Sequence, residues 1–244
     1  MGPRRSRAFA GILKEPRTNA SVATDRWRRH HPVHTMILLP RLYCIADVAF
    51  LPTTADLLAF SKELAAGGCT LLQYRNKSGN GRGMLEQARE LNKRLRAAAP
   101  APHLRLIMND RSDLCLAADF DGVHVGQEDL SPESVRGIIG PDRWLGVSTH
   151  NPEQLREADL TSADYLAIGP VFATSSKDKP DPVVGLEGVR RARALTPKPL
   201  VAIGGITRAN AASVLEAGAD SVAVISDLLR EPRKSAEEFF RILR

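Results

Sequence analysis

The stretch TSADYLAIG, residues 161–169, contains the pattern that decides the fold of this chain. An Ala-Asp pair precedes the short apolar run YLAIG, and the same arrangement recurs in AADFDGVHVG (117–126) and AGADSVAVI (217–225). The apolar runs are continuous and do not alternate with polar residues, which is typical of parallel strands covered on both faces. The repeat therefore predicts parallel strands that recur along the chain.

Eight short apolar runs of this kind follow one another from residue 41 onward. They are RLYCIA (41–46), TLLQYR (70–75), LRLIMN (104–109), GVHV (122–125), WLGVS (144–148), YLAIG (165–169), LVAIG (200–204) and SVAV (221–224). Amphipathic segments lie between them, and we expect helix caps at Thr54, Ser131, Asn151 and Thr207. This alternation predicts an α/β fold, a single-domain (β/α)8 TIM barrel, with a doubly wound sheet as the alternative.

The positive charge of the chain is concentrated at its N-terminus. Residues 1–35 contain eight arginines or lysines against two acidic residues, which accounts for the whole formal net charge of +6. The formally neutral remainder argues against nucleic acid or an anionic membrane as a partner. We expect residues 1–35 to be a basic, disordered extension and residues 36–244 to be the catalytic barrel domain. The alternatives for the extension are a segment upstream of a true start at Met36 and an organelle transit peptide.

The cysteines and the apolar segments indicate a compartment. Cys44, Cys69 and Cys115 lie in apolar runs without CxxC spacing, so they predict core thiols and neither disulfides nor a zinc site. No apolar segment reaches the roughly 18 residues that a membrane span requires. We therefore expect a cytoplasmic protein without a membrane partner, and the sequence leaves open whether it forms a homo-oligomer.

Polar residues follow almost every predicted strand, where a barrel gathers its functional groups at the C-terminal mouth. They include Arg75, Lys77, Asn109, Asp110, Asp129, Ser148, the hydroxyls and lysines of the loop GPVFATSSKDKP (169–180), Gly204, Gly205 and Ser226. Cationic, hydroxyl and Gly-Gly backbone groups suit phosphate oxygens. Two carboxylates at the same mouth would repel phosphate unless Mg²⁺ accompanies it. The sequence therefore predicts a diphosphate bound as its Mg²⁺ complex.

Several of these residues have a structural alternative. Asp110 could cap the helix RSDLCLAA, and Asp129 could cap the helix that begins near Ser131. The loop 169–180 could be an ordinary solvated surface loop. His124 and His150 are interpreted as structural histidines and are assigned no catalytic role.

At these residues the sequence resembles the thiamine-phosphate synthase family, from about residue 41 to the C-terminus. The motifs LLQYRNK, IMNDR, GVHVGQEDL, LGVSTH, IGPVFATSSK, AIGGIT and VAVIS occur in the family's order. The resemblance implies a transferase that joins hydroxymethylpyrimidine diphosphate to a thiazole phosphate, giving thiamine monophosphate and pyrophosphate. It also implies that pyrophosphate departs first and leaves a pyrimidine carbocation, so that no covalent nucleophile is needed.

The resemblance assigns roles to individual residues. The pyrimidine diphosphate would be held by Gln73, Tyr74, Arg75, Asn76, Lys77, Asn109, Ser148 and Lys177. The thiazole phosphate would contact Thr174, Ser175, Ser176, Gly205, Ile225 and Ser226. Asp110 and Asp129 would bind the Mg²⁺ cofactor. The residues that act on the departing charge would be Arg75, Lys77, Ser148 and Lys177. The chain departs from the family at Asn76, where an acid is usual, and in the loop 178–184.

Three other functions fit parts of the pattern. A thiazole tautomerase-like relative would not need both QYRNK and the Asp110/Asp129 pair. A phosphosugar-binding isomerase or epimerase barrel would need a placed general base and no diphosphate clamp. A non-enzymatic nucleic-acid binder would depend on the basic extension, and the neutral barrel argues against it.

Overall fold

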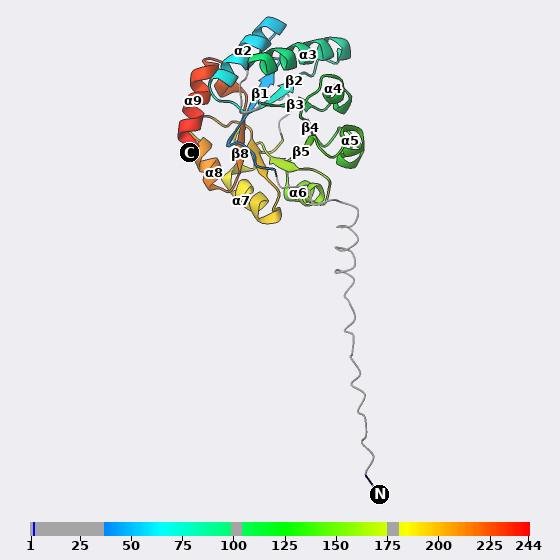
Figure 1. Ribbon diagram of the computed structural model, residues 1–244. Coiled ribbons are helices and arrows are strands. Elements are labelled where there is room, and N and C mark those ends of the chain that lie inside the picture. Colours follow the sequence, from blue (N-terminus) through cyan, green and yellow to red (C-terminus); the bar gives the residue numbers. More distant parts are fainter. Residues whose placement is uncertain (1, 3–36, 99–103, 175–180) are drawn as a thin grey trace. The chain divides into compact units, whose positions relative to one another are not determined.

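The structure is a computed structural model that describes Gly2 and residues 37–98, 104–174 and 181–244. Eight strands, each parallel to both of its neighbours, close into a barrel (Figure 1). They are β1 (Leu42–Asp47), β2 (Leu71–Arg75), β3 (Arg105–Asn109), β4 (Gly122–Val125), β5 (Trp144–Thr149), β6 (Tyr165–Ile168), β7 (Leu200–Ile203) and β8 (Ser221–Val224). Each predicted run is a strand whose ends lie within one residue of the prediction.

Helices follow the strands and form the outer layer of the barrel (Figure 1). They are α2 (Thr54–Ala66), α3 (Gly81–Ala98), α4 (Ser112–Ala117), α5 (Pro132–Ile139), α6 (Pro152–Asp159), α7 (Gly185–Leu195), α8 (Ala211–Glu216) and α9 (Pro232–Ile242), with the short 3-10 helix η1 (Ser226–Leu228) before α9. Residues Met36–Arg244 form one compact unit. The single-domain barrel is therefore confirmed against the doubly wound alternative, and the predicted extension 1–35 lies outside the described residues. Within the described part of the chain, every helix is too short or too polar to cross a membrane.

Side chains of the strands divide between two apolar cores, because successive residues of a strand point to opposite faces. The inner core contains Tyr43, Ile45, Leu71, Ile107, Tyr165, Ala167, Val201 and Ala223. The outer core lies between the barrel and the helices and includes the remaining strand residues such as Leu72 and Leu166. Cys44, Cys69 and Cys115 belong to this outer core as buried free thiols, as the sequence predicted.

Two of the four predicted helix caps are confirmed. The Ser131 hydroxyl accepts the N–H of Ser134 at 3.3 Å at the start of α5. The side-chain amide oxygen of Asn151 accepts the N–H of Gln154 at 2.9 Å at the start of α6. In both helices proline occupies the first turn, where its missing N–H costs nothing.

The other two predicted caps are wrong. The cap of α2 is Thr53, one residue earlier, because its hydroxyl and the Asp56 carboxylate accept each other's backbone N–H groups. Helix α8 begins at Ala211 and not directly after Thr207. The side chain of Asn210 accepts the Thr207 N–H at 2.8 Å and closes a turn there, which delays the helix.

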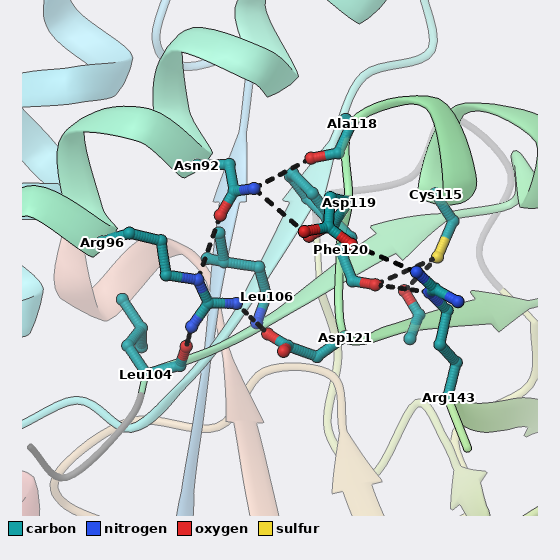
Figure 2. Close-up of polar contacts among 11 residues, drawn as sticks. Asn92, Arg96, Leu104, Leu106, Cys115, Ala118, Asp119, Phe120, Asp121 and Arg143 are labelled. Carbon is teal, nitrogen blue, oxygen red and sulfur yellow. Dashed lines mark hydrogen bonds and ion pairs between the residues drawn. The ribbon is translucent and has the colours of Figure 1, made fainter.

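In each of the three recurring segments, the aspartate directly before the strand has a structural role at the N-terminal end of the barrel. In 161–169 and 217–225 it belongs to the Ala-Asp pair, and in 117–126 it is Asp121, two residues after the pair. Asp121 directly precedes β4, and its Oδ2 accepts the backbone N–H of Leu106 in β3 at 2.7 Å. The same carboxylate pairs with Arg96 of α3, whose guanidinium also donates to the carbonyl oxygen of Leu104 (Figure 2). One aspartate thus links a helix to two adjacent strands.

This Asp–Arg bracket occurs twice more in the described residues. Asp164, before β6, accepts the N–H of Leu145 at 2.7 Å and pairs with Arg136 of α5. Asp220, before β8, accepts the N–H of Leu200 at 2.7 Å and pairs with Arg193 of α7. The repeated pattern therefore fastens the N-terminal end of the barrel, and the opposite end is left to the loops that carry function.

Candidate active site at the C-terminal mouth of the barrel

The polar residues predicted from the sequence lie on or just after the C-terminal ends of the strands. Arg75 ends β2, Asn109 ends β3, and Ser148 lies near the end of β5. Lys77, Asp110 and Asp129 lie in the loops that follow β2, β3 and β4. Because the strands are all parallel, these ends open on one side of the barrel, so one mouth holds this set of residues.

Asp110, Lys77 and Asp129 form a charged group at this mouth. The ammonium group of Lys77 pairs with the Asp110 carboxylate, whose side chain is only 18% exposed. Burial raises the pKa of Asp110, Lys77 lowers it, and the neighbouring Asp129 carboxyl raises it again. The pKa of Asp110 is raised overall, which means that holding its carboxylate in the ionised form beside Asp129 is unfavourable.

Neither aspartate serves as a helix cap. Helix α4 follows Arg111 and has no side-chain cap, whereas Asp110 itself adopts a left-handed backbone with φ of 61°. That conformation is held by its backbone N–H, which donates to the carbonyl oxygen of His124 at 2.8 Å. The Asp129 carboxylate accepts the N–H of Gly126 at 2.7 Å, and α5 is capped by Ser131. The structural alternative for both residues is thus removed.

Arg75 is oriented by an acid that the sequence analysis missed. Its guanidinium pairs with Asp47 at the end of the neighbouring strand β1, in register with it. Asp47 is only 1% exposed, and its second oxygen accepts the N–H of Ala49 at 3.0 Å. A charged residue that ends an otherwise apolar strand was the signal for it in the sequence.

Gln73 and Asn109 are buried at the inner end of the mouth. By strand alternation they share the inner face with Leu71 and Ile107, which belong to the inner core. The amide nitrogen of Asn109 is buried and has no hydrogen-bond partner among the described residues. Because an unsatisfied buried donor is costly, this nitrogen is suited to a ligand acceptor such as a phosphate oxygen.

Tyr74 and Asn76 take a different direction from the other predicted residues. The Tyr74 hydroxyl donates to the side chain of Gln87 in α3 at 2.8 Å, and its ring packs on Phe120. The Asn76 amide donates to the Tyr74 hydroxyl at 2.9 Å. Both side chains therefore lie between β2 and α3, behind the strand that carries Gln73 and Arg75, and they brace that strand.

The loops after β6, β7 and β8 form the other side of the mouth. Gly204 and Gly205 have φ of 102° and 62°, and a Cβ on Gly205 would lie 2.5 Å from the carbonyl oxygen of Ala173. Only glycine permits this close contact between the two loops. Thr174 continues the first of them, and Ile225 and Ser226 follow β8, with Ile225 against the inner core. Ser175, Ser176 and Lys177 lie outside the described residues.

His124 and Ser148 face each other inside the barrel. The Nε2 atom of His124 lies 2.8 Å from the Ser148 hydroxyl, and its Nδ1 atom lies 3.1 Å from the Tyr165 hydroxyl. Burial lowers the pKa of His124 to about 4, although the Asp129 carboxylate acts in the opposite direction. His124 is thus a neutral, buried histidine, as a structural role requires. Its contact with Ser148, a predicted site residue, was not expected from the sequence. His150 bonds the carbonyl oxygen of Gly169 at 2.7 Å.

A (β/α)8 barrel that gathers carboxylates and cations at the C-terminal ends of its strands has the architecture of a barrel enzyme. Comparison with known proteins narrows this class. A sequence profile described as thiamine monophosphate synthase matches residues 42–228. The thiamine-phosphate synthase of Koribacter versatilis is 60% identical over 208 residues, which cover 84% of this chain and 96% of the relative.

Other comparisons agree. The thiamine-phosphate synthase of Chloroflexus aurantiacus is 45% identical over 186 residues, covering 76% of this chain and 83% of that protein. The solved thiamine phosphate pyrophosphorylase from Pyrococcus furiosus superimposes with a TM-score of 0.72 at 36% identity and covers 83% of this chain and 95% of its own. The chain belongs to the thiamine monophosphate synthase family, and it is an enzyme of the transferase class.

Proposed function

We propose that this protein joins hydroxymethylpyrimidine diphosphate to a thiazole phosphate, releasing pyrophosphate and thiamine monophosphate, in a Mg²⁺-dependent reaction. The observation that carries the proposal is the pair of carboxylates, Asp110 and Asp129, that interact beside Lys77 at the barrel mouth. Family membership supports the overall reaction. We propose in addition the two substrates, the Mg²⁺ requirement and the roles of the individual residues.

The residues at the mouth fit a magnesium ion. Mg²⁺ is usually bound through one or two carboxylates, with waters and substrate phosphates completing its octahedron. Asp110 and Asp129 supply such a pair, and neither is used as a helix cap. Among the described residues, no group of three or more His, Cys, Asp and Glu could form an all-protein metal cage. The set thus suits a metal that reaches the site together with a diphosphate.

The cations and donors of the mouth would stabilise the departing pyrophosphate. When bound, Mg²⁺ supplies positive charge to the diphosphate oxygens. Arg75, held in place by buried Asp47, and Lys77 offer charge-assisted hydrogen bonds to the same oxygens. The amide nitrogen of Asn109, which has no partner in the described part of the chain, adds a neutral donor. Donors that are positioned before the reaction are the largest common contribution to such catalysis.

The proposed chemistry needs no covalent nucleophile. The C–O bond between the pyrimidine methylene and the diphosphate breaks first, leaving a carbocation that the aminopyrimidine ring stabilises. The thiazole nitrogen then attacks this carbon and forms the C–N bond. The cysteines are poor candidates for a covalent role, since burial raises the pKa of Cys115 to about 12 and also raises that of Cys44.

The loops after β6, β7 and β8 would hold the thiazole phosphate. Barrel enzymes commonly bind phosphate at the loops after the seventh and eighth strands. Here those loops contribute Gly205, Ile225 and Ser226, and Thr174 lies in the loop that Gly205 contacts. We retain Ser175 and Ser176 in this role from the sequence, and Lys177 as a contact of the pyrimidine diphosphate.

The direct test is product formation. Purified protein incubated with both substrates and Mg²⁺ should yield thiamine monophosphate, identified by its mass, together with pyrophosphate. Reactions that lack either substrate serve as controls. Absence of the product when both substrates and metal are present would overturn the proposal.

A further inference from the structure

A chain of polar side chains crosses the interior of the barrel. Gln73 donates from Nε2 to the Tyr43 hydroxyl at 2.9 Å, and Tyr43 lies 3.1 Å from the Tyr165 hydroxyl. Tyr165 lies 3.1 Å from Nδ1 of His124, and Nε2 of His124 lies 2.8 Å from the Ser148 hydroxyl. These residues come from five different strands, β2, β1, β6, β4 and β5. The two ends of the chain, Gln73 and Ser148, are residues of the proposed pyrimidine site.

The interior members of this chain are shielded from water. Tyr43, Tyr165 and His124 are all buried, so their polar atoms must satisfy one another. Burial also raises the pKa of both tyrosines, which therefore keep their protons. Each phenol has one proton to donate, and a neutral imidazole carries one N–H and one acceptor nitrogen.

Because each phenol and the neutral imidazole has only one proton, the hydrogen bonds from Gln73 to Ser148 can be donated in only one direction. Because the Gln73 amide donates to Tyr43, the single proton of Tyr43 must go to Tyr165, and that of Tyr165 to Nδ1 of His124. His124 then carries its proton on Nε2 and donates to Ser148. The Ser148 proton is left to be donated to a ligand, and Gln73 keeps its carbonyl oxygen as an acceptor.

The close packing of this chain depends on a glycine. A Cβ on Gly146 of β5 would lie 2.2 Å from Cζ of Tyr165 and 2.4 Å from Nδ1 of His124. Distances this short are excluded for real carbon atoms, so any larger residue at position 146 would push the tyrosine and the histidine apart. The glycine thus has a specific role in bringing the two middle members of the chain together.

We propose that Tyr43, Tyr165 and His124 are positioning residues that fix Ser148 as a hydrogen-bond donor and Gln73 as an acceptor, so that the site selects a 4-aminopyrimidine. This inference rests on the proposed function, in which Gln73 and Ser148 hold the pyrimidine. An aminopyrimidine presents an N–H donor beside a ring-nitrogen acceptor, which matches an acceptor and a donor on the protein. The 4-oxo analogue presents the opposite order and would leave buried groups unpaired.

The direction of the chain can be tested without substrate. Nitrogen-15 chemical shifts of the imidazole in the full-length protein report which ring nitrogen of His124 carries the proton, and His124→Gln assigns the signal. We expect the Nε2–H form in the wild type and a shift toward a mixture of both forms in Tyr165→Phe. The Nδ1–H form in the wild type would reverse the chain and overturn the inference.

The specificity is tested by binding. Calorimetry with the 4-amino and 4-oxo pyrimidine diphosphates, in the presence of Mg²⁺, gives the two dissociation constants. The selectivity is the dissociation constant of the 4-oxo compound divided by that of the 4-amino compound. Tyr165→Phe should reduce this ratio by about tenfold, the factor that corresponds to one hydrogen bond. Tyr43→Phe should act in the same direction and serves as a second variant if Tyr165→Phe fails to fold. The matched control is Thr196→Val. It removes a buried hydroxyl that donates to Asp159 and takes no part in the hydrogen bonds between Gln73 and Ser148.

The outcomes separate the two proposals. A wild-type ratio retained in both phenylalanine variants would overturn the specificity role, while product formation would still support the synthase reaction. Failure of the wild type to bind either pyrimidine would overturn the proposed function and the specificity that rests on it. The shift measurement would still decide the direction of the chain, because it uses no ligand.

Discussion

Asp110 and Asp129 are the residues on which the metal assignment depends. Burial raises the pKa of Asp110, the neighbouring Asp129 carboxyl adds to this, and Lys77 offsets the rise only in part. Such an arrangement becomes favourable when a cation binds between the carboxylates. A divalent cation that enters with a diphosphate meets this condition.

Removal of either carboxylate should therefore impair turnover. We expect Asp110→Asn and Asp129→Asn each to lower kcat on the order of 10²-fold or more, the scale seen when one charge-stabilising group is lost. Steady-state kinetics over a range of Mg²⁺ concentrations provide the measurement. Glu90→Gln, which removes a partly exposed carboxylate paired with Arg94 on α3, is the control and should behave as wild type. Full activity in excess EDTA would contradict the metal requirement.

His124 should make the stability of the protein depend on pH. Burial lowers its pKa from 6.5 to about 4, so the unfolded chain binds a proton in this interval that the folded protein does not. The stabilising contribution is complete above the unfolded pKa and is lost as the pH falls toward the folded pKa. We expect a loss of up to about 3 kcal/mol, since one pKa unit corresponds to about 1.4 kcal/mol.

Denaturant unfolding between pH 7 and pH 4, without added metal, measures this loss. His124→Gln removes the titrating group and should flatten this part of the stability curve. Equal pH dependence in the wild type and the variant would show that other groups are responsible.

At the scale of elements, the Asp–Arg brackets hold helices to pairs of strands at the end of the barrel away from the site. Arg136 and Asp164 are the most buried of these pairs, with side chains 13% and 8% exposed. Removal of one partner leaves the other charge buried without compensation, which typically costs several kcal/mol. The bracket should therefore contribute to stability and not to turnover.

We expect Asp164→Asn to reduce the free energy of unfolding by about 3 kcal/mol and to leave kcat of the folded enzyme unchanged. The exposed pair of Glu187 and Arg191 on α7 is the matched control, and Glu187→Gln should cost less than about 1 kcal/mol. Urea unfolding and activity assays at a temperature where both variants are folded give the two readouts. A large loss of kcat in folded Asp164→Asn would show that the two ends of the barrel are coupled.

At the scale of the whole molecule, the barrel accounts for the described structure from Leu42 onward, since β1 is its first strand. The basic extension 1–35 holds the whole net charge of the chain and stays a prediction from sequence. We expect a protein that lacks residues 1–35 to fold and to keep its kcat and KM. A truncated protein that is folded but inactive would show that the extension belongs to the site.

The periodic parts of the chain were predictable without a structure. Continuous apolar runs such as GVHV and SVAV were found at their true positions because parallel strands are covered on both faces, which leaves a strong local signal. The grouping of Asp110, Asp129 and Lys77 at one mouth followed from the same pattern, since parallel strands end on one side. Cap positions such as Thr53 were missed because two neighbouring threonines look equivalent in sequence.

Local sequence thus determined the strands, the barrel and the list of polar groups at its mouth. Only the tertiary structure decided which way each group points. It turned Tyr74 and Asn76 toward α3, paired Arg75 with Asp47, and joined Gln73 to Ser148 through three buried residues of other strands. The physical reason is that most of these contacts join side chains of different elements, which only the folded barrel brings together. Tyr43 and Tyr165, for example, are 122 positions apart. Barrel closure brings these two tyrosines together, and the glycine at position 146 leaves room for Tyr165 beside His124; no local pattern in the sequence indicates either contact.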